Sequence, residues 1–244
     1  MTMRLDQLLA FRGLMPSRAR ARDAIRRGCV TVGGEPEARP GALVGENVEI
    51  KVGDPAARFV SRAALKLDYA LDRFGFDPAG RVAIDLGASA GGFTQVLLER
   101  GARTVHAIDV GHGQIAPILA ADSRVRVLEG VNARDLSADH VDGPVEALVS
   151  DVSFISQKLV MPPALGLCAP GAFAVVLAKP QFEAGRDRVG KRGIVRDPEI
   201  ARAAAQDLAD WLDGMPAWRV LGMVPAPIAG RDGNQEYAIG ATMG

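Results

Sequence analysis

The feature that most constrains the fold is a short apolar run that ends abruptly in a glycine-rich turn, at residues 82–94 (Val-Ala-Ile-Asp-Leu-Gly-Ala-Ser-Ala-Gly-Gly-Phe-Thr). An apolar run that stops at glycine predicts a buried strand. Gly87, Gly91 and Gly92 allow the backbone to turn tightly and to approach a ligand, because they carry no Cβ. Residues 93–100 are then predicted to form a helix whose N-terminus points into the turn. This is the usual position of a nucleotide-like ligand in an open α/β sheet.

The spacing of these glycines narrows the choice of ligand. It does not match the G-x-G-x-x-G pattern of dinucleotide sites, and it lacks the Gly-Lys-Ser/Thr ending of a phosphate loop. Asp85 enters the turn, and Asp109 closes the next apolar run; an acid at the end of a second strand suits a ribose diol. The pattern indicates an adenosine cofactor, with S-adenosylmethionine as the first candidate. The alternative is a structural strand–turn–helix that binds no ligand.

Composition excludes several classes of protein. The formal net charge of the 244 residues is zero, so affinity for nucleic acid must come from an uneven distribution of charge. Two cysteines, Cys29 and Cys168, and three histidines predict neither a disulfide framework nor a zinc cluster, and we expect no metal site. The apolar stretch at 165–178 is broken by Pro170 and Gly171 and is too short to span a bilayer. Since the N-terminus also lacks the apolar core of a signal peptide, we expect a soluble, cytoplasmic protein.

The N-terminal part of the chain is locally basic, with 11 Lys and Arg against 7 Asp and Glu in residues 1–62. Helical spacing of leucines predicts a helix within residues 3–14. Ser17 is the expected N-cap of a second helix that stops at Gly28. Alternating valines and isoleucines then predict a compact sheet that ends near residue 53.

The second helix carries a stripe of arginines. Arg18, Arg22 and Arg26 recur every four residues, Arg20 adds to the basic surface, and only Asp23 opposes it. A solvated helix face normally mixes charges to form i,i+4 pairs. Unpaired arginines suit the phosphates of a nucleic acid better. Both interpretations, a nucleic-acid surface and a solvated face, remain open from composition alone.

We expect a linker at residues 54–60, where Pro55 disfavours helix before it. The second domain is expected at residues 61–244, with Ser61 as the cap of a helix that ends near Phe74. In that helix Leu65, Tyr69 and Leu71 are expected on the buried side. A single lysine in a helix, here Lys66, is ordinarily exposed to solvent.

Alternating strands and helices predict a mainly parallel sheet with helices on both faces, an α/β fold. The further strands are expected at 104–109, 125–129, 147–150, 172–178, 219–224 and 236–241. The intervening helices are expected at 114–121, 157–167 and 198–212. Because only a turn-rich connection joins the last two strands, they should pair antiparallel.

Reactive groups of such a sheet gather at the carboxyl ends of its strands. Asp151 ends the fourth strand of the second domain, and Lys179 ends the fifth. A lysine directly after four apolar residues is poorly solvated and should have a partner, for which Asp151 is the natural candidate. The alternative is an ion pair with a purely structural role.

The cofactor loop resembles that of the FtsJ-like ribose methyltransferases, and later motifs narrow the resemblance to the TlyA family, once named haemolysins. It covers nearly the whole chain. The first domain, which begins Arg4-Leu5-Asp6, is similar to the RNA-binding domain of ribosomal protein S4. The resemblance implies a Rossmann-like methyltransferase sheet with an antiparallel last strand, preceded by a small α+β RNA-binding domain at residues 1–53.

The resemblance also implies a set of functional residues. The catalytic tetrad corresponds to Lys66, Asp151, Lys179 and Glu236. Residues expected to bind the cofactor are Asp85, Gly87, Ala88, Ser89, Gly91, Gly92, Phe93, Asp109, Asn132 and Asp151. The arginine stripe, the start of the first domain and the segment after Lys179 supply the residues expected to bind RNA, which are Arg4, Arg18, Arg20, Arg22, Arg26, Arg186, Arg188 and Lys191.

The last three belong to a long polar segment, 181–197, which directly follows Lys179. A loop of this length in such a place is more often functional than idle. We interpret it as a mobile lid that faces RNA; the alternative is a disordered spacer.

The implied activity is S-adenosylmethionine-dependent 2′-O-methylation of ribosomal RNA, on cytidine. Ribosomal subunits are the expected partners, with the large subunit slightly favoured, and the protein is expected to act as a monomer without a membrane. One rival is a non-catalytic RNA-binding assembly factor, against which the intact loop and all four tetrad candidates argue. The other is a pore-forming haemolysin, for which the sequence offers neither a membrane helix nor an amphipathic hairpin.

Overall fold

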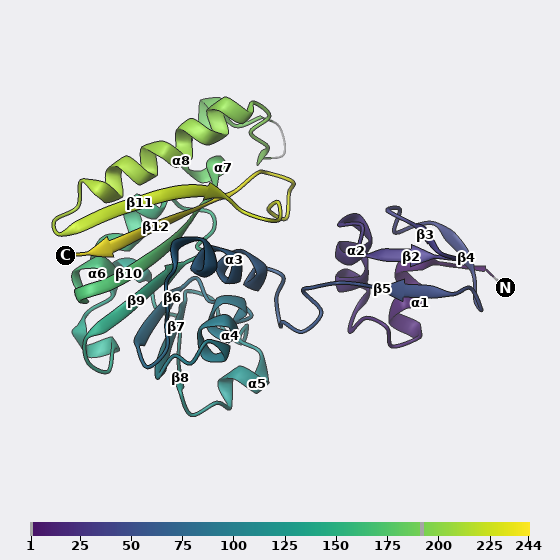
Figure 1. The fold of residues 1–244 in the computed structure, drawn as a ribbon, viewed down its shortest axis with the longest axis horizontal. Helices are drawn as coiled ribbons and strands as arrows, with labels where there is room; N and C mark the ends of the chain where they lie inside the picture. Colours follow the sequence, from purple (N-terminus) through teal and green to yellow (C-terminus); the bar gives the residue numbers. More distant parts are fainter. Residues whose placement is uncertain (1, 191–192) are drawn as a thin grey trace. The chain divides into compact units, whose positions relative to one another are not determined.

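The computed structural model describes residues 2–190 and 193–244, and it divides into two compact units, Met1–Arg58 and Phe59–Gly244 (Figure 1). The first unit combines two helices with two small sheets. Its helices are α1 (Leu5–Phe11) and α2 (Arg18–Arg26). Its strands are β1 (Thr2–Arg4), β2 (Val30–Val32), β3 (Glu35–Pro36), β4 (Leu43–Gly45) and β5 (Ile50–Val52).

The first unit is held together by a small apolar core. Leu5 and Leu9 of α1 pack against Ala24 and Ile25 of α2 and against Val30 of the sheet. The sheet has the order β3-β2-β5, and a separate antiparallel pair joins β1 to β4. Ser17 caps α2 as expected, since its hydroxyl accepts a hydrogen bond from the Arg20 backbone. The first helix is shorter than predicted because residues 2–4 form β1 instead.

The second unit is built on a seven-stranded sheet with the order β11-β12-β10-β9-β6-β7-β8. Its strands are β6 (Val82–Leu86), β7 (Thr104–Asp109), β8 (Val125–Glu129), β9 (Val145–Ser150), β10 (Cys168–Ala178), β11 (Trp218–Pro225) and β12 (Tyr237–Met243). Strands β6 to β10 pair in parallel, whereas β12 is antiparallel to both of its neighbours, β10 and β11. The predicted α/β class, mainly parallel sheet and antiparallel last strand are confirmed.

Helices cover both faces of this sheet (Figure 1). The helices are α3 (Ala64–Phe74), α4 (Gly92–Glu99), α5 (Pro117–Ala120), α6 (Gln157–Gly166), α7 (Pro180–Glu183) and α8 (Pro198–Asp213), with short 3-10 turns at Ala133–Asp135, Ala138–His140 and Arg186–Arg188. Neighbouring residues of β9 face opposite layers, because side chains alternate along a strand. Val149 joins the core under α3 and α4, and Leu148 joins the core under α6 and α8.

Several predicted boundaries were wrong. The helix expected from Ser61 begins at Ala64, and its buried residues include Leu67 and Leu71, whereas Leu65 and Tyr69 are only partly buried. Three of the residues expected in a helix at 114–121 precede α5, which begins at Pro117. Strand β10 starts four residues early and passes Pro170 and Gly171 through a shift of register. Glu236 lies just before β12 rather than in it.

Candidate active site

The glycine-rich turn forms the floor of a cavity at the carboxyl ends of β6, β9 and β10. Gly87 and Gly91 adopt the left-handed region, with φ of +78° and +91°. A Cβ on Gly87 would lie 3.0 Å from the backbone of Val152, so the close approach of two loops explains this glycine. Gly92 opens α4 with ordinary backbone geometry, and a Cβ there would lie 2.9 Å from Ser61. The turn therefore has left-handed backbone at Gly87, Ser89 and Gly91, and a Cβ on any of its three glycines would meet neighbouring atoms.

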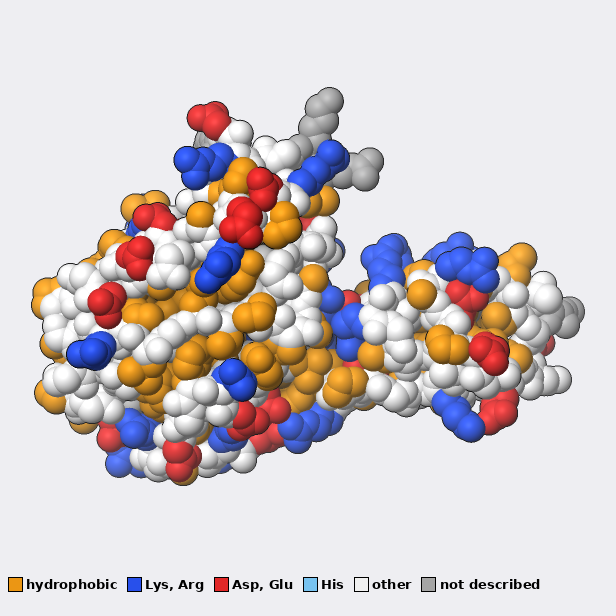
Figure 2. Space-filling model, turned by 45° about the horizontal axis from the view of Figure 1, so that its top comes forward, with side chains coloured by type: hydrophobic (Ala, Val, Ile, Leu, Met, Phe, Trp, Pro, Cys, Tyr) orange, Lys and Arg blue, Asp and Glu red, His pale blue; other side chains and the backbone are white. Residues whose placement is uncertain are grey.

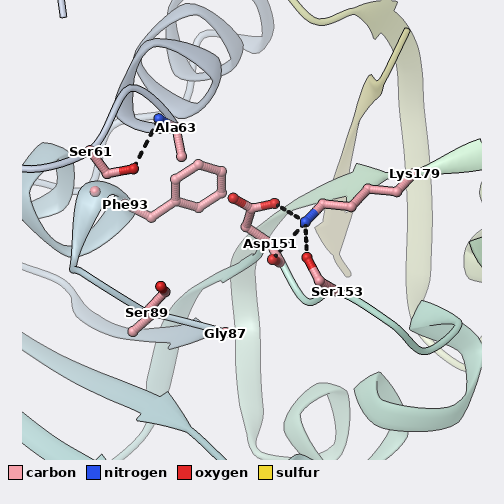
Figure 3. A pocket seen from close by; sticks show the side chains of 10 residues that line it. Ser61, Ala63, Gly87, Ser89, Phe93, Asp151, Ser153 and Lys179 are labelled. Carbon is pink, nitrogen blue, oxygen red and sulfur yellow. Dashed lines mark hydrogen bonds and ion pairs between the residues drawn. The ribbon is translucent and has the colours of Figure 1, made fainter. Parts of the chain in front are cut away.

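The cavity has a volume of about 740 Å³ and opens on a smaller recess of about 160 Å³ over the same turn. The recess, shown in Figure 3, is lined by Gly87, Ala88, Ser89, Gly92, Phe93, Asp151, Ser153 and Lys179, together with Ser61 and Ala63. The larger cavity extends past Asp109 and Asn132 on one side and reaches Lys66 and Glu236 on the other. A cavity of this volume accommodates a nucleoside-sized cofactor and part of a second ligand.

Asp85 was expected to touch the cofactor, but it lies beneath the turn and does not line the cavity. Its Oδ2 accepts a hydrogen bond of 2.7 Å from the hydroxyl of Thr94 in α4. Burial, reinforced by the nearby carboxylate of Asp151, raises the pKa of Asp85 to about 7, against the opposing hydrogen bond from Thr94. Its position indicates that Asp85 holds the turn onto α4. Gly91 likewise stands behind the cavity, against Leu119 and Ile115.

Asp109 organises the rim of the cavity beside the turn. Its two carboxylate oxygens accept hydrogen bonds of 2.8 Å from the backbone N–H groups of Ser89 and Gly111. Asp109 lines the cavity there beside Val110 and Gln114. An ionised acid fixed in this manner by two loops can accept the hydroxyls of a ribose.

A carboxylate that the sequence analysis missed supports the same rim. Glu129, the last residue of β8, accepts hydrogen bonds from the backbone N–H groups of Gly113 and Gln114 at 2.6 and 2.9 Å. These two bonds hold the pKa of Glu129 below its ordinary range. Gln114 then accepts a hydrogen bond from the Ser89 hydroxyl at 3.1 Å. In the sequence, the only indication of this role was that Glu129 is a charged residue at the end of a predicted strand.

Lys179 and Asp151 meet at the other side of the recess (Figure 3). The Nζ of Lys179 lies 2.8 Å from Oδ1 of Asp151 and donates hydrogen bonds to the Asp151 carbonyl at 3.1 Å and the Ser153 hydroxyl at 2.6 Å. Only 8% of Lys179 is exposed, so the ammonium group faces the recess rather than bulk water. Ser153 was not predicted, and its place two residues after Asp151 was the only signal.

Lys66 and Glu236 form a second buried ion pair, with 2.5 Å between Nζ and Oε2. Lys66 is 6% exposed and Glu236 is 3% exposed. The expectation of a solvent-facing Lys66 was wrong, because α3 turns this side chain inward beneath the loop that precedes β12. All four residues of the expected tetrad therefore line one cavity.

Asn132 and Phe154 occupy the mouth of the cavity. Asn132 uses its Oδ1 to cap the turn at Ala133–Asp135, accepting from the Arg134 backbone at 3.1 Å, and it lines the cavity. Phe154 is 90% exposed and has a φ of +70°, a strained backbone for a bulky side chain. Its ring centre lies 5.5 Å from that of Phe182. A large apolar ring held exposed at a cavity mouth suits stacking on a base.

The residues expected to bind RNA are not equivalent. Basic side chains stand out on the smaller unit in Figure 2. Arg4 and Arg18 form ion pairs with the buried carboxylate of Asp6, at 3.1 and 3.0 Å. Burial by itself would raise the pKa of Asp6, but these two arginines hold it below its ordinary value. Arg20 donates to the carbonyl of Ala56 at 2.7 Å.

Only some arginines of the stripe lack a partner among the residues that the structure describes. Arg22 and Arg26 are exposed, and neither has a hydrogen bond or ion pair with any residue that the structure describes. In the second unit Arg188 is exposed in a short 3-10 turn. Lys191 and the side chain of Arg186 lie outside the described residues.

The segment at 181–197 is more structured than a simple loop. It begins within α7, and Glu183 accepts hydrogen bonds from Ser156 and Gln157. Farther along, the buried side chain of Asn234 accepts from the Val195 backbone at 2.9 Å and donates to the carbonyl of Gly193 at 2.8 Å. The described parts of the segment are thus anchored to the unit at both ends.

Sequence comparison shows which families the two parts of the chain match. Residues 59–243 match the FtsJ-like methyltransferase family, and residues 3–50 match the S4 domain. A protein of Mycobacterium tuberculosis named 16S/23S rRNA (cytidine-2′-O)-methyltransferase TlyA is 42% identical over 235 residues, which cover 96% of this chain and 87% of that protein.

The chain belongs to the TlyA family of FtsJ-like methyltransferases. Hemolysin A of Brachyspira hyodysenteriae, another relative, is 37% identical over 96% of this chain and 98% of its own length. Among solved structures, a putative hemolysin from Streptococcus thermophilus is 36% identical and superposes with a TM-score of 0.76, over 99% of this chain and 88% of that chain. Within the described residues, no helix of this family member is long and apolar enough to cross a bilayer.

Proposed function

We propose that this protein transfers the methyl group of S-adenosylmethionine to a ribose 2′-hydroxyl of ribosomal RNA. The observation that carries the proposal is the Lys179 ammonium group, held by Asp151 and Ser153 at one wall of a recess whose floor is the glycine turn. A methylated cytidine in ribosomal RNA is the product named for the Mycobacterium tuberculosis relative. The same substrate is our proposal for this chain.

The residues around the recess fit an adenosine cofactor. Asp109 has carboxylate oxygens available for a ribose, Asn132 offers an amide for the adenine edge, and Gly87 leaves room for a close backbone approach. When bound, S-adenosylmethionine supplies an electrophilic methyl group on a positively charged sulfur. The carboxylate of Asp151 lines the same recess and offsets a positive charge there.

The reaction needs alignment and the removal of one proton. With the methyl donor bound, the bond from the methyl carbon to the ribose oxygen would replace the methyl–sulfur bond and leave a neutral thioether, and the hydroxyl proton would pass to water. Lys179 is placed to donate a hydrogen bond to that oxygen and to stabilise the negative charge that develops on it. Asp151 and Ser153 hold Nζ of Lys179 in place, and holding reacting groups in line lowers the entropic part of the barrier.

The Lys66–Glu236 pair lines the larger cavity beyond the recess, and we assign this part of the cavity to the target nucleotide. Arg231 and Asp232 line the same side of the cavity. We assign the exposed ring of Phe154 to stacking on a base of the RNA, since stacking needs an accessible aromatic face. The first domain, residues 1–53, supplies further phosphate contacts through Arg22 and Arg26.

The test is nucleoside mapping. Purified protein is incubated with labelled S-adenosylmethionine and with small subunits, large subunits or protein-free ribosomal RNA, and the RNA is digested and analysed by mass spectrometry. We expect 2′-O-methylcytidine, formed on large subunits in preference, and no more than trace amounts with Lys179→Ala. Labelled base-methylated nucleosides, or no transfer to any of the three RNAs, would refute the proposal.

A further inference from the structure

Gln157 bridges the two strand ends that carry Asp151 and Lys179. It is the first residue of α6, its side chain is 1% exposed, and it does not line the cavity. The Ser150 hydroxyl donates to Oε1 of Gln157 at 2.7 Å, and Nε2 of Gln157 donates to the carbonyl of Leu177 at 3.0 Å.

The Gln157 bridge lies at the point where the backbone pairing between β9 and β10 ends. The last residues paired between β9 and β10 are Ser150 and Val176. The strand pairing ends with that pair, and Asp151 and Lys179 both lie beyond it. The two partners of Gln157 come one residue before Asp151 and two residues before Lys179. The amide side chain of Gln157 therefore joins the two strands where the next backbone hydrogen bonds of the sheet would be, next to Asp151 and Lys179.

A second contact ties the same two segments together. Glu183 ends α7, the short helix that starts directly after Lys179. Its carboxylate accepts hydrogen bonds from the Ser156 hydroxyl at 2.6 Å and from the Gln157 backbone at 2.9 Å. Residues 151–156, which carry Ser153, are therefore fixed at their far end by the element that follows Lys179.

We propose that Gln157 is a positioning residue for methyl transfer: by joining Ser150 to Leu177 it sets the distance between Asp151 and Lys179. The inference rests on the proposed function, because it assigns the purpose of this bridge to the alignment of Lys179. A buried amide that meets its partners at both ends restrains them more strongly than apolar packing of the same size, since hydrogen bonds are directional. The bridge acts on the chemical step, as it touches neither cofactor nor RNA site.

The test is Gln157→Met, which preserves the length of the side chain and removes both hydrogen bonds. We expect kcat to fall by about ten- to a hundredfold, because a displacement of about 1 Å in an active site has effects of this order. The KM for RNA and the calorimetric affinity for S-adenosylmethionine should stay unchanged. Ser150→Ala removes one arm of the bridge and should lower kcat by a smaller factor.

A matched control separates positioning from loss of stability. Leu165→Ala lies on the same helix, removes buried packing and leaves the bridge intact. It should lower the melting temperature at least as much as Gln157→Met and retain wild-type kcat when assayed well below that temperature. If the two variants lose kcat equally, or if Gln157→Met retains wild-type kcat, the bridge is structural and the proposal is wrong. Should Gln157→Met not fold, wild-type kcat in Ser150→Ala overturns the proposal.

A readout without turnover keeps this inference apart from the proposed function. The chain has five lysines, so the side-chain resonances of lysine labelled with carbon-13 at Cε can be resolved by NMR and Lys179 identified from Lys179→Ala. The Lys179 resonance should shift or broaden in Gln157→Met and in Ser150→Ala, while Lys51 in the first unit stays unchanged. An unshifted Lys179 resonance refutes the bridge. Failure of the wild-type protein to methylate RNA refutes the proposed function, whatever the spectra show.

Discussion

The ammonium group of Lys66 lies 2.5 Å from the carboxylate of Glu236, across 170 positions of sequence, and both side chains are almost fully buried. Two consequences follow from such a pair. It joins α3 to the start of β12 at one wall of the cavity, and neither partner can be removed alone without leaving a buried charge.

We therefore expect Lys66→Met to destabilise the protein by about 3–5 kcal/mol, the usual cost of breaking a buried ion pair. The double variant Lys66→Met/Glu236→Gln should recover much of that loss. Urea unfolding measures both. The control is Lys51→Met, because Lys51 forms an exposed pair with Glu49. An equal, small effect of Lys66→Met and Lys51→Met would contradict the assignment.

Lys179→Ala should abolish most methyl transfer while leaving cofactor and RNA binding close to wild type. Its contribution is made in the transition state, and a positioned acid–base group contributes about a hundred- to ten-thousandfold in rate. Lys179→Arg should not restore activity, because the guanidinium group holds its donors in another geometry. A single-turnover assay at saturating cofactor and RNA isolates the chemical step. Retention of more than about a tenth of the wild-type rate would show that Lys179 is structural.

Asp109→Ala should weaken the binding of S-adenosylmethionine by about tenfold or more, since the ribose hydroxyls would no longer have an ionised hydrogen-bond acceptor. Calorimetry measures the change. Asp122→Ala serves as control, because Asp122 pairs with Arg124 at the surface and does not line the cavity. Gly91→Trp should weaken the affinity as well, by pushing Leu119 and Ile115 away from the turn. Preferential binding of NAD by the wild-type protein would rule out the cofactor assignment.

The arginines of α2 should separate into two groups. Arg22→Ala/Arg26→Ala should weaken RNA binding and reduce the slope of log affinity against log salt by about one for each phosphate that is no longer neutralised, at no cost in stability. Arg18→Ala should instead lower the stability of the first unit, because the buried Asp6 loses a partner. Filter binding at several salt concentrations and thermal unfolding distinguish the two effects. Unchanged RNA affinity in the double variant would make this stripe a solvated face.

Asp85 should make stability depend on pH. Its pKa is raised from 3.8 to about 7 in the folded state, mainly by burial, so the folded protein binds a proton that the unfolded chain has released between these values. The free energy of unfolding should therefore fall as pH rises from 4 to 7, by up to about 1.4 kcal/mol per pH unit from this group. Asp85→Asn keeps the acceptor for Thr94 and should remove this slope, as measured by urea unfolding at pH 5 and pH 8. Parallel pH profiles for the two proteins would disprove the assignment.

Local patterns predicted the strands and the reactive residues at their carboxyl ends. The apolar run 82–86 ending at Gly87 predicted the central strand, and the glycine turn predicted the place of the site. Short polar elements were missed or misplaced, because strands as short as β1 and β4 carry too few residues for periodicity to register. Glu129 carried no signal beyond its position at a strand end, and Gln157 carried none beyond its position at the start of a helix.

The sequence by itself determined the class of the fold and which residues could carry the chemistry, because strand periodicity and a glycine turn depend only on neighbours in the chain. Tertiary structure alone decided their electrostatic roles. From its sequence context Lys66 is expected at the surface, but α3 brings it into an ion pair with Glu236. Asp85 is expected to bind the cofactor, but it is buried against α4 and accepts a hydrogen bond from Thr94 instead. Burial and pairing between distant segments set the charge and the access of a side chain, and neither is encoded by local spacing.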